Sequence, residues 1–113
     1  MLKSSEQVRD RVLVISINEP RLEANNAPLF RQILLDRIED GYQQIVIDLR
    51  NVQFIDSSAL GAMISAVKRM AALGSITLAA PNAAISRLLE LTRMSKVFPI
   101  TQTVDEAVLR HAG

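Results

Sequence analysis

The sequence predicts a single α/β domain: a small, mostly parallel mixed sheet of four to five strands with about four helices. Two observations lead to this prediction. Apolar runs rich in β-branched residues alternate with segments whose apolar residues recur every three or four positions, which is the pattern of strands separated by single helices. In addition, 113 residues are the length of about one domain, and no internal repeat, low-complexity tract or linker divides them. Strands joined by single helices form parallel units with right-handed crossovers, so we expect one domain over residues 1–113.

The strands are expected at the most continuous apolar runs. Residues 12–17, 45–49 and 76–80 are nearly uninterrupted apolar segments, as the buried strands of a parallel sheet are. Val8 is expected in a short edge strand that forms a hairpin with the first of these and adds an antiparallel edge. The last strand is predicted over residues 97–100, where a proline favours an edge position.

The helices are expected between these strands. Residues 27–39 place their apolar side chains at helical spacing, and Gly41 follows as a helix end. A second helix closes at Gly74, a short third helix carries an apolar face, and the final helix covers residues 104–111. Each helix is preceded by a residue type that favours a helix start, namely Asn25 or Asn26, Asp56, Asn82 and Thr103.

The residue types that the chain lacks exclude several chemistries. It has no cysteine and one histidine, which excludes thiolate zinc sites, iron–sulfur clusters, cysteine nucleophiles and any site with two imidazoles. Its four glycines stand alone, so no P-loop or dinucleotide-binding fingerprint can be written. The carboxylates of Asp36, Glu39 and Asp40 are best explained as the solvated face of a helix. We therefore expect no metal and no cofactor. His111 is expected to be a cation near the negative end of the last helix.

The charge balance directs the chain neither to nucleic acid nor to a membrane. The sequence has thirteen Lys and Arg residues and twelve Asp and Glu residues, which gives a net charge of +1. The aromatic share of 4% is low for a protein that stacks on bases. No segment approaches the roughly 20 apolar residues of a membrane helix. The first residues also lack the apolar core of a signal peptide. We expect a cytoplasmic protein with no direct nucleic-acid or membrane partner.

The segment Asp56-Ser57-Ser58 is the strongest candidate for a functional site. It follows the apolar pair Phe54-Ile55 and directly precedes a strongly periodic helix. One interpretation is helix capping, because Asp and Ser side chains accept hydrogen bonds from the first amides of a helix. However, two hydroxyls and a carboxylate exceed what one cap requires. In an open α/β sheet, the loop that leaves the carboxyl end of a strand is also where ligands and partners dock.

This segment resembles the signature of the STAS domains, and within them that of the anti-sigma factor antagonists. The family pattern is a strand, then Asp-Ser-Ser or Asp-Ser-Thr, then Gly-Leu-Gly at the start of a helix. Here residues 54–61 read Phe-Ile-Asp-Ser-Ser-Ala-Leu-Gly. The similarity covers nearly the whole chain, because the helix that runs into Lys68-Arg69, the strand at Ile76, the helix at residues 85–89 and the edge at residues 96–98 follow in the expected order.

The resemblance implies a binding protein that is switched by phosphorylation and is not itself an enzyme. Unphosphorylated members bind an anti-sigma factor that is also a serine kinase, and thereby free the sigma factor. The kinase phosphorylates the serine directly after the motif aspartate, which corresponds to Ser57, and a PP2C-type phosphatase reverses the modification. The sequence is also compatible with a homodimer of this chain. The residues that the resemblance implies for partner binding are Glu23, Asp56, Ser58, Ala59 and Leu60.

Three residues depart from the family pattern. Glu23 stands where an aspartate is common, in a loop about one residue longer than expected, and Ala59 replaces the usual glycine. These two departures bear on partner choice and on the efficiency of phosphorylation. Arg93 stands where many relatives have a helix-ending glycine, which concerns local geometry.

Two other functions compete with the switch. The first is a STAS scaffold that assembles with signalling or transport proteins and is never phosphorylated, and the substitutions at Glu23 and Ala59 make it credible. The second is an enzyme with Ser57 or Ser58 as nucleophile. It is disfavoured, because the sequence places no base nearby and has no glycine cluster for an oxyanion loop.

Overall fold

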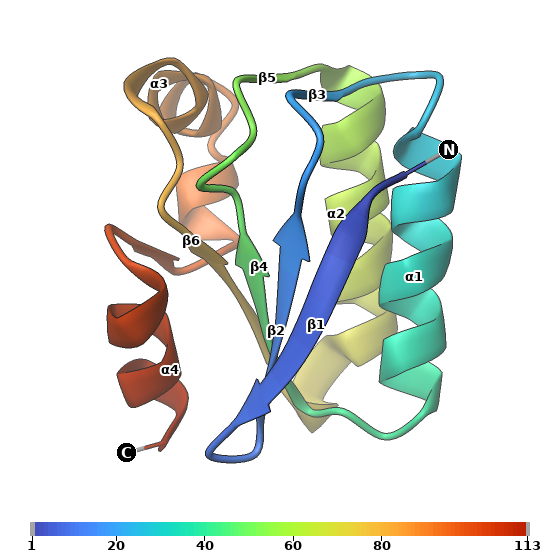
Figure 1. Cartoon of the computed structure of the whole chain (residues 1–113), viewed down its shortest axis with the longest axis vertical. Helices are drawn as coiled ribbons and strands as arrows, with labels where there is room; N and C mark the ends of the chain where they lie inside the picture. The colour runs from blue at the N-terminus through green and yellow to red at the C-terminus, as the bar shows by residue number, and fades with distance from the viewer. Residues whose placement is uncertain (1, 113) are drawn as a thin grey trace.

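The computed structural model describes residues 2–112, which form one α/β domain around a five-stranded mixed sheet. The predicted fold class is therefore confirmed. The strand order is β1-β2-β4-β6-β7; β1 is antiparallel to β2 and the other neighbours are parallel (Figure 1). The strands of this sheet are β1 (Ser4–Arg9), β2 (Val12–Ile17), β4 (Gln44–Asp48), β6 (Ser75–Ala79) and β7 (Ile100–Thr101).

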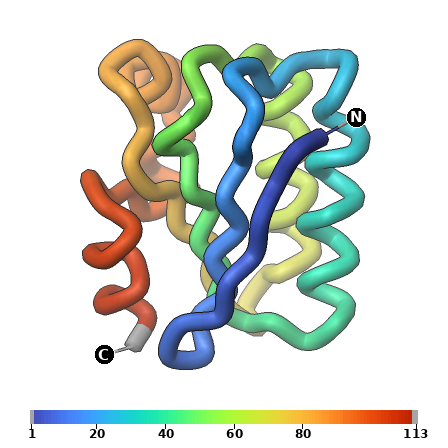
Figure 2. Tube along the Cα trace, in the orientation of Figure 1, coloured from blue at the N-terminus to red at the C-terminus, as the bar shows by residue number. Residues whose placement is uncertain are grey.

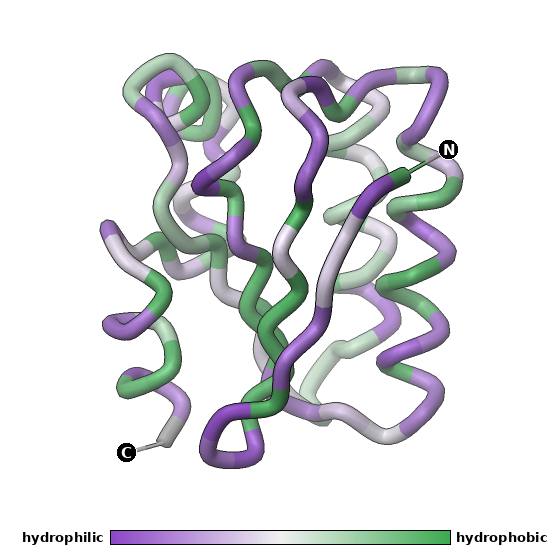
Figure 3. Tube along the Cα trace, in the orientation of Figure 1, coloured by the Kyte–Doolittle hydropathy of each residue, from purple (hydrophilic) through white to green (hydrophobic). Residues whose placement is uncertain are grey.

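Helices cover both faces of the sheet. Helices α1 and α2 lie side by side on one face, and α4 packs on the other (Figure 1). The three central strands carry the most hydrophobic stretches of the chain (Figure 3), as expected for strands buried on both faces. Among the described residues, no helix is both long and apolar enough to cross a membrane. The helices are α1 (Ala27–Glu39), α2 (Ser57–Met70), α3 (Ala83–Leu91) and α4 (Val104–Ala112), with 3₁₀ turns at Ala71–Leu73 and Met94–Lys96.

A second, two-stranded parallel sheet lies beyond the carboxyl end of the main sheet. It pairs β3 (Arg21–Leu22) with β5 (Phe54–Ile55), in the register Leu22 to Ile55. The tube in Figure 2 shows the two segments running next to each other above the strands β2 and β4 from which they continue. Because the pairing is parallel, the residues that follow β3 and β5 leave this small sheet side by side. It is this sheet that brings the loop before α1 next to the start of α2.

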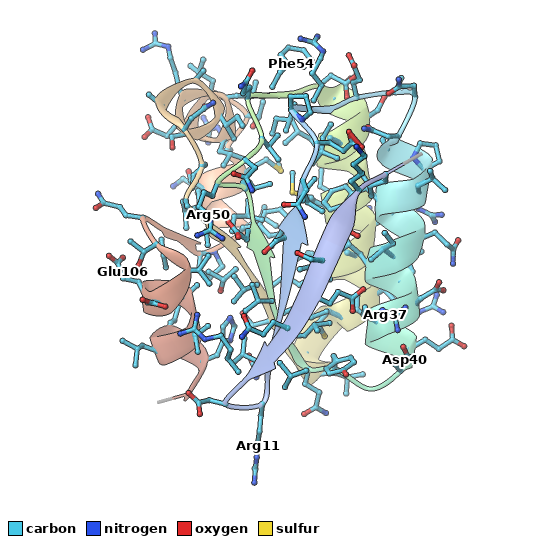
Figure 4. All side chains as sticks on the ribbon, viewed as in Figure 1. Arg11, Arg37, Asp40, Arg50, Phe54 and Glu106 are labelled. Atoms are coloured by element: carbon cyan, nitrogen blue, oxygen red, sulfur yellow. The ribbon has the colours of Figure 1, made fainter. Side chains whose placement is uncertain are left out.

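A buried carboxylate joins the strands that lead into this small sheet. Asp48, at the end of β4, is 1% exposed and accepts hydrogen bonds from the Ser16 hydroxyl of β2 at 2.8 Å and from the Arg50 backbone amide at 3.0 Å. The Arg50 guanidinium (Figure 4) also donates to it at 3.0 Å. Since a buried carboxylate is costly unless it is paired, these contacts fix the carboxyl ends of both strands.

The last strand begins three residues later than the sequence predicts. Residues 97 and 98 follow a 3₁₀ turn instead, and Phe98 is buried in the main core rather than in a strand. The strand β7 is Ile100–Thr101, directly after the proline. Phe98 is therefore apolar because it packs into the core after a turn, and not because it lies in a strand.

His111 is also placed differently from the expectation that it is a cation at a helix end. Its imidazole lies between the Thr77 hydroxyl of β6, 2.8 Å from Nε2, and the Gln44 side-chain oxygen of β4, which Nδ1 contacts. Burial, and to a lesser degree the neighbouring Arg110 guanidinium, lowers the pKa of His111 from 6.5. The ring is thus neutral at pH 7, and it anchors α4 to the sheet.

Candidate functional site

Asp56 caps α2, as the sequence predicts, and its carboxylate also reaches a second segment. Oδ1 accepts hydrogen bonds from the backbone amides of Ser58 at 2.9 Å and Ala59 at 3.1 Å. Oδ2 accepts one from the amide of Ala24, in the loop after β3, at 3.1 Å. The parallel pairing of β3 and β5 brings these groups together. One carboxylate therefore holds the start of α2 and the loop before α1 in one arrangement.

Ser57 is the first residue of α2 and is exposed, and Ser58 beside it is exposed as well. Their backbone positions are fixed by the Asp56 cap. A hydroxyl at this point lies at the positive end of the helix dipole, where amide groups face outward. The site can therefore accommodate an anionic group on Ser57 without a change of fold.

Glu23 lies on the same end of the molecule, in the loop that Asp56 contacts. Its carboxylate pairs with Nε of Arg21 at 3.1 Å, and its backbone amide donates to Oδ1 of Asn26 at 2.9 Å. Asn26 is 7% exposed, and its amide group also donates to the Arg21 carbonyl at 2.9 Å. Asn26 is thus the N-cap residue of α1 by position, but its side chain closes the loop instead of capping the helix.

Two residues of this surface were missed by the sequence reasoning. The guanidinium of Arg21 lies 4.1 Å from the centroid of the Phe54 ring, across the small sheet. Phe54 is 40% exposed and projects at the end of the molecule where β3 and β5 lie (Figure 4). The available signal was an aromatic residue two positions before Asp56, which the sequence analysis treats only as part of an apolar pair. The pairing with Arg21 depends on a contact 33 positions apart and has no local signal.

Ala59 and Leu60 correct the expected partner-binding set. Ala59 is 0% and Leu60 8% exposed, and both belong to the main hydrophobic core. Both side chains therefore face the core and contribute little to the surface that a partner would meet. The surface of the site consists instead of the side chains of Arg21, Glu23, Phe54, Ser57 and Ser58.

The side chains at this site combine hydroxyl groups with charges of both signs. Among residues 2–112 no group of three or more His, Asp or Glu side chains is arranged to hold a metal ion. The site brings together two exposed hydroxyls at a helix start, two carboxylates and one guanidinium. Such a set suits reversible contact with another protein and a change of charge at Ser57.

This chain is similar to known proteins in both sequence and fold. Residues 4–107 match the family model described as the STAS domain. A candidate anti-sigma factor antagonist of Thermotoga maritima is 31% identical over 104 residues, covering 90% of this chain and 91% of the relative. The crystal structure of a candidate anti-sigma factor antagonist from the same organism superimposes with a TM-score of 0.90 at 28% identity, covering 97% of this chain and 95% of that chain.

A more distant structure shares the fold alone. The Bacillus cell fate determinant SpoIIAA in its phosphorylated form superimposes with a TM-score of 0.72 at 19% identity, covering 97% of this chain and 98% of that chain.

Proposed function

The chain belongs to the STAS domain family, and from this membership we propose that it works as an anti-sigma factor antagonist controlled by phosphorylation of Ser57. In its unphosphorylated form it binds an anti-sigma factor that is also a serine kinase, and so releases the sigma factor. The kinase transfers phosphate to Ser57, and a PP2C-type phosphatase removes it. The support from relatives is that two proteins, each 31% identical across most of the chain, carry the name of candidate anti-sigma factor antagonist.

The observation that carries this proposal is the placement of Ser57. Its hydroxyl is exposed on the first residue of α2, between the capping carboxylate of Asp56 and an exposed Ser58. A kinase can reach it without unfolding any part of the chain. The backbone around it is held by three amide hydrogen bonds to Asp56, so the acceptor serine is presented in one geometry.

Phosphate on Ser57 leaves the fold in place because of the helix start. Free amide groups and the helix dipole stabilise a negative charge there by about 0.3–1 kcal/mol. The modified and unmodified proteins therefore share one structure, and the effect falls on the partner.

The partner loses affinity because the charge of the surface changes. Phosphate adds about −1.5 to −2 charges at pH 7, next to Asp56 and near Glu23, whereas the whole chain has a net charge of +1. Like charges opposed across an interface cost several kcal/mol. Since each 1.4 kcal/mol is about tenfold in affinity, the complex dissociates without refolding.

A phosphorylation assay with site variants tests the proposal. The protein is incubated with ATP and a purified anti-sigma factor kinase that binds it, and the phosphate is mapped by mass spectrometry. Ser57→Ala abolishes incorporation, whereas the adjacent Ser58→Ala retains it as the matched control. Equal incorporation into wild type and Ser57→Ala would falsify the site. If the wild type takes up no phosphate and still binds the kinase, the switch is rejected in favour of the scaffold function.

A further inference from the structure

Apart from Phe54 at its edge, the surface around Ser57 is polar. Ala59 and Leu60, the two apolar residues of the expected partner-binding set, are in the core. Protein interfaces usually concentrate their affinity in an apolar or aromatic anchor that fits a pocket, with polar groups around it. The surface next to Phe54 supplies such a pocket.

This pocket is a hollow between β5 and α3, here called the β5–α3 hollow. Its volume is about 250 Å³, and its walls are almost entirely apolar. Phe54 forms one exposed wall, while Ile55 and Ile85 are buried at its base. The residues that line it are Gln53, Phe54, Ile55, Ala84, Ile85 and Leu88.

The β5–α3 hollow is already formed in the free protein. Asn82, the N-cap residue of α3, accepts a hydrogen bond from the Ile85 amide at 2.8 Å. The other end of the same side chain donates to the Gln53 carbonyl at 3.2 Å, just before β5. One side chain thus holds the two walls together. A partner does not have to order them on binding, which lowers the entropic cost of association.

Positive charge borders the β5–α3 hollow. The Arg21 guanidinium lies over the Phe54 ring, and its side chain is 54% exposed. Arg87 is exposed on α3, one helical turn after Ala84, which lines the hollow. Because the Arg21 guanidinium is already paired with Glu23 at 3.1 Å, Arg87 is the cation that favours an acidic residue in a segment entering the hollow.

We propose that the β5–α3 hollow receives one large apolar side chain of the anti-sigma factor kinase, with an acidic residue beside it. The volume is below the roughly 300–1,000 Å³ of small-molecule pockets, and it suits a single side chain. Phe54 lies two residues before Asp56, so a partner that covers Ser57 also reaches the hollow. This inference rests on the proposed function, because it names where the same partner is anchored.

A second depression, between α1 and α2, borders Ser58 on the other side of the site. Its lining includes Arg31, Gln32 and Ser65 as well as Ser58, so its walls are more polar than those of the β5–α3 hollow. The β5–α3 hollow is therefore the better anchor site, and the depression between the helices serves as the rival location in the test.

A pair of substitutions on neighbouring residues tests the proposal. Ala84 lines the hollow and Ala83 does not, yet both are exposed at the start of α3. Ala84→Arg fills the mouth of the hollow, while Ala83→Arg adds the same side chain and charge outside it. The affinity of each unphosphorylated variant for the purified kinase is measured by isothermal titration calorimetry. Ala84→Arg lowers affinity at least tenfold and Ala83→Arg changes it less than twofold, with both variants showing the wild-type circular dichroism spectrum.

The outcomes separate this inference from the proposed function. Equal affinities for Ala84→Arg and Ala83→Arg overturn the anchor, while loss of binding on phosphorylation of Ser57 still stands. Binding that ignores phosphorylation overturns the proposed function, whatever the hollow does. If Ala84→Arg has no effect but Gln32→Arg weakens binding, the anchor lies between α1 and α2.

The charge at the border is tested separately. Arg87→Glu lowers affinity at low salt, and the loss shrinks as salt screens the contact. Arg93→Glu, an exposed arginine beyond the end of α3, is the control. Identical salt dependence of the Arg87→Glu and Arg93→Glu variants overturns the acidic part of the proposal.

Discussion

The carboxylate of Asp56 accepts a hydrogen bond at 3.1 Å from the backbone amide of Ala24, which lies 32 positions earlier in the chain. The same carboxylate caps α2 through two further amides. The loop before α1 and the first turn of α2 are therefore one unit, and Glu23 and Ser57 lie on the same surface because of it.

Removing this carboxylate should destabilise the protein and free the loop. Asp56→Ala is expected to lower the free energy of unfolding by about 1–2 kcal/mol, which is the usual cost of losing a helix N-cap. Asp56→Asn retains one acceptor oxygen and should lose less. Urea unfolding measures both, and amide exchange reports the loop: exchange at Ala24 accelerates in Asp56→Ala. An unchanged Ala24 exchange rate would show that the hydrogen bond does not hold the loop.

A negative charge at Ser57 should act on the partner and not on the fold. Ser57→Asp is expected to keep the free energy of unfolding of the wild type or to raise it by up to about 1 kcal/mol, because the added charge lies at the helix start. Its affinity for the kinase should fall at least tenfold. Ser57→Asn is similar in size and uncharged, so it separates charge from shape. Equal affinities of the Asp and Asn variants would mean that charge is not what releases the partner.

Alanine at Gly74 and alanine at Gly61 should change the free energy of unfolding in opposite directions. A Cβ on Gly74 would collide with the backbone of Gln43, approaching its Cα to 2.8 Å, while the Gln43 carbonyl is held by the Ser75 amide at 2.8 Å. Gly74→Ala should therefore cost about 3 kcal/mol or more. Gly61, within α2, has open space around it, and Gly61→Ala should stabilise by up to about 1 kcal/mol. Thermal unfolding distinguishes them, and equal effects would contradict the close packing at Gly74.

His111 should make stability depend on pH just below neutrality. Its pKa is lowered from 6.5, chiefly by burial, so the unfolded chain binds a proton more readily than the folded one. The stabilisation is present above pH 6.5 and is lost as the pH falls through 6.5 toward the folded pKa. His111→Gln should remove this part of the difference between unfolding free energies at pH 7.5 and 5.5. An NMR titration midpoint of His111 at or above 6.5 would contradict the assignment.

The sequence predicted those parts of the molecule that are determined locally. The Val12–Ile17 strand, the Ala27–Glu39 helix and the Asp56 cap follow from periodicity and capping preference, and the structure has them at the predicted positions. Arg93 likewise adopts the left-handed conformation, with φ 62°, in which a glycine is common.

The features that the sequence did not predict depend on long-range packing. The strands β3 and β5 have two residues each, too short for any periodic signal, yet their pairing assembles the site. Phe98 is apolar because it enters the core from a turn, and a strand pattern is indistinguishable from that in sequence. The direction of Leu60 depends on the rotation of α2, which the Asp56 cap and the core together determine.

The three hydrogen bonds to Asp56 also bear on how phosphate could be transferred to Ser57. Both carboxylate oxygens already accept amide hydrogens, so taking up the serine proton would weaken the cap that orients the hydroxyl. The Asp56 carboxylate, the nearest to Ser57 in sequence, therefore orients the serine and does not act as its base. A kinase acting on Ser57 has to bring its own general base, and the chain contributes a rigid acceptor rather than assistance with the chemistry.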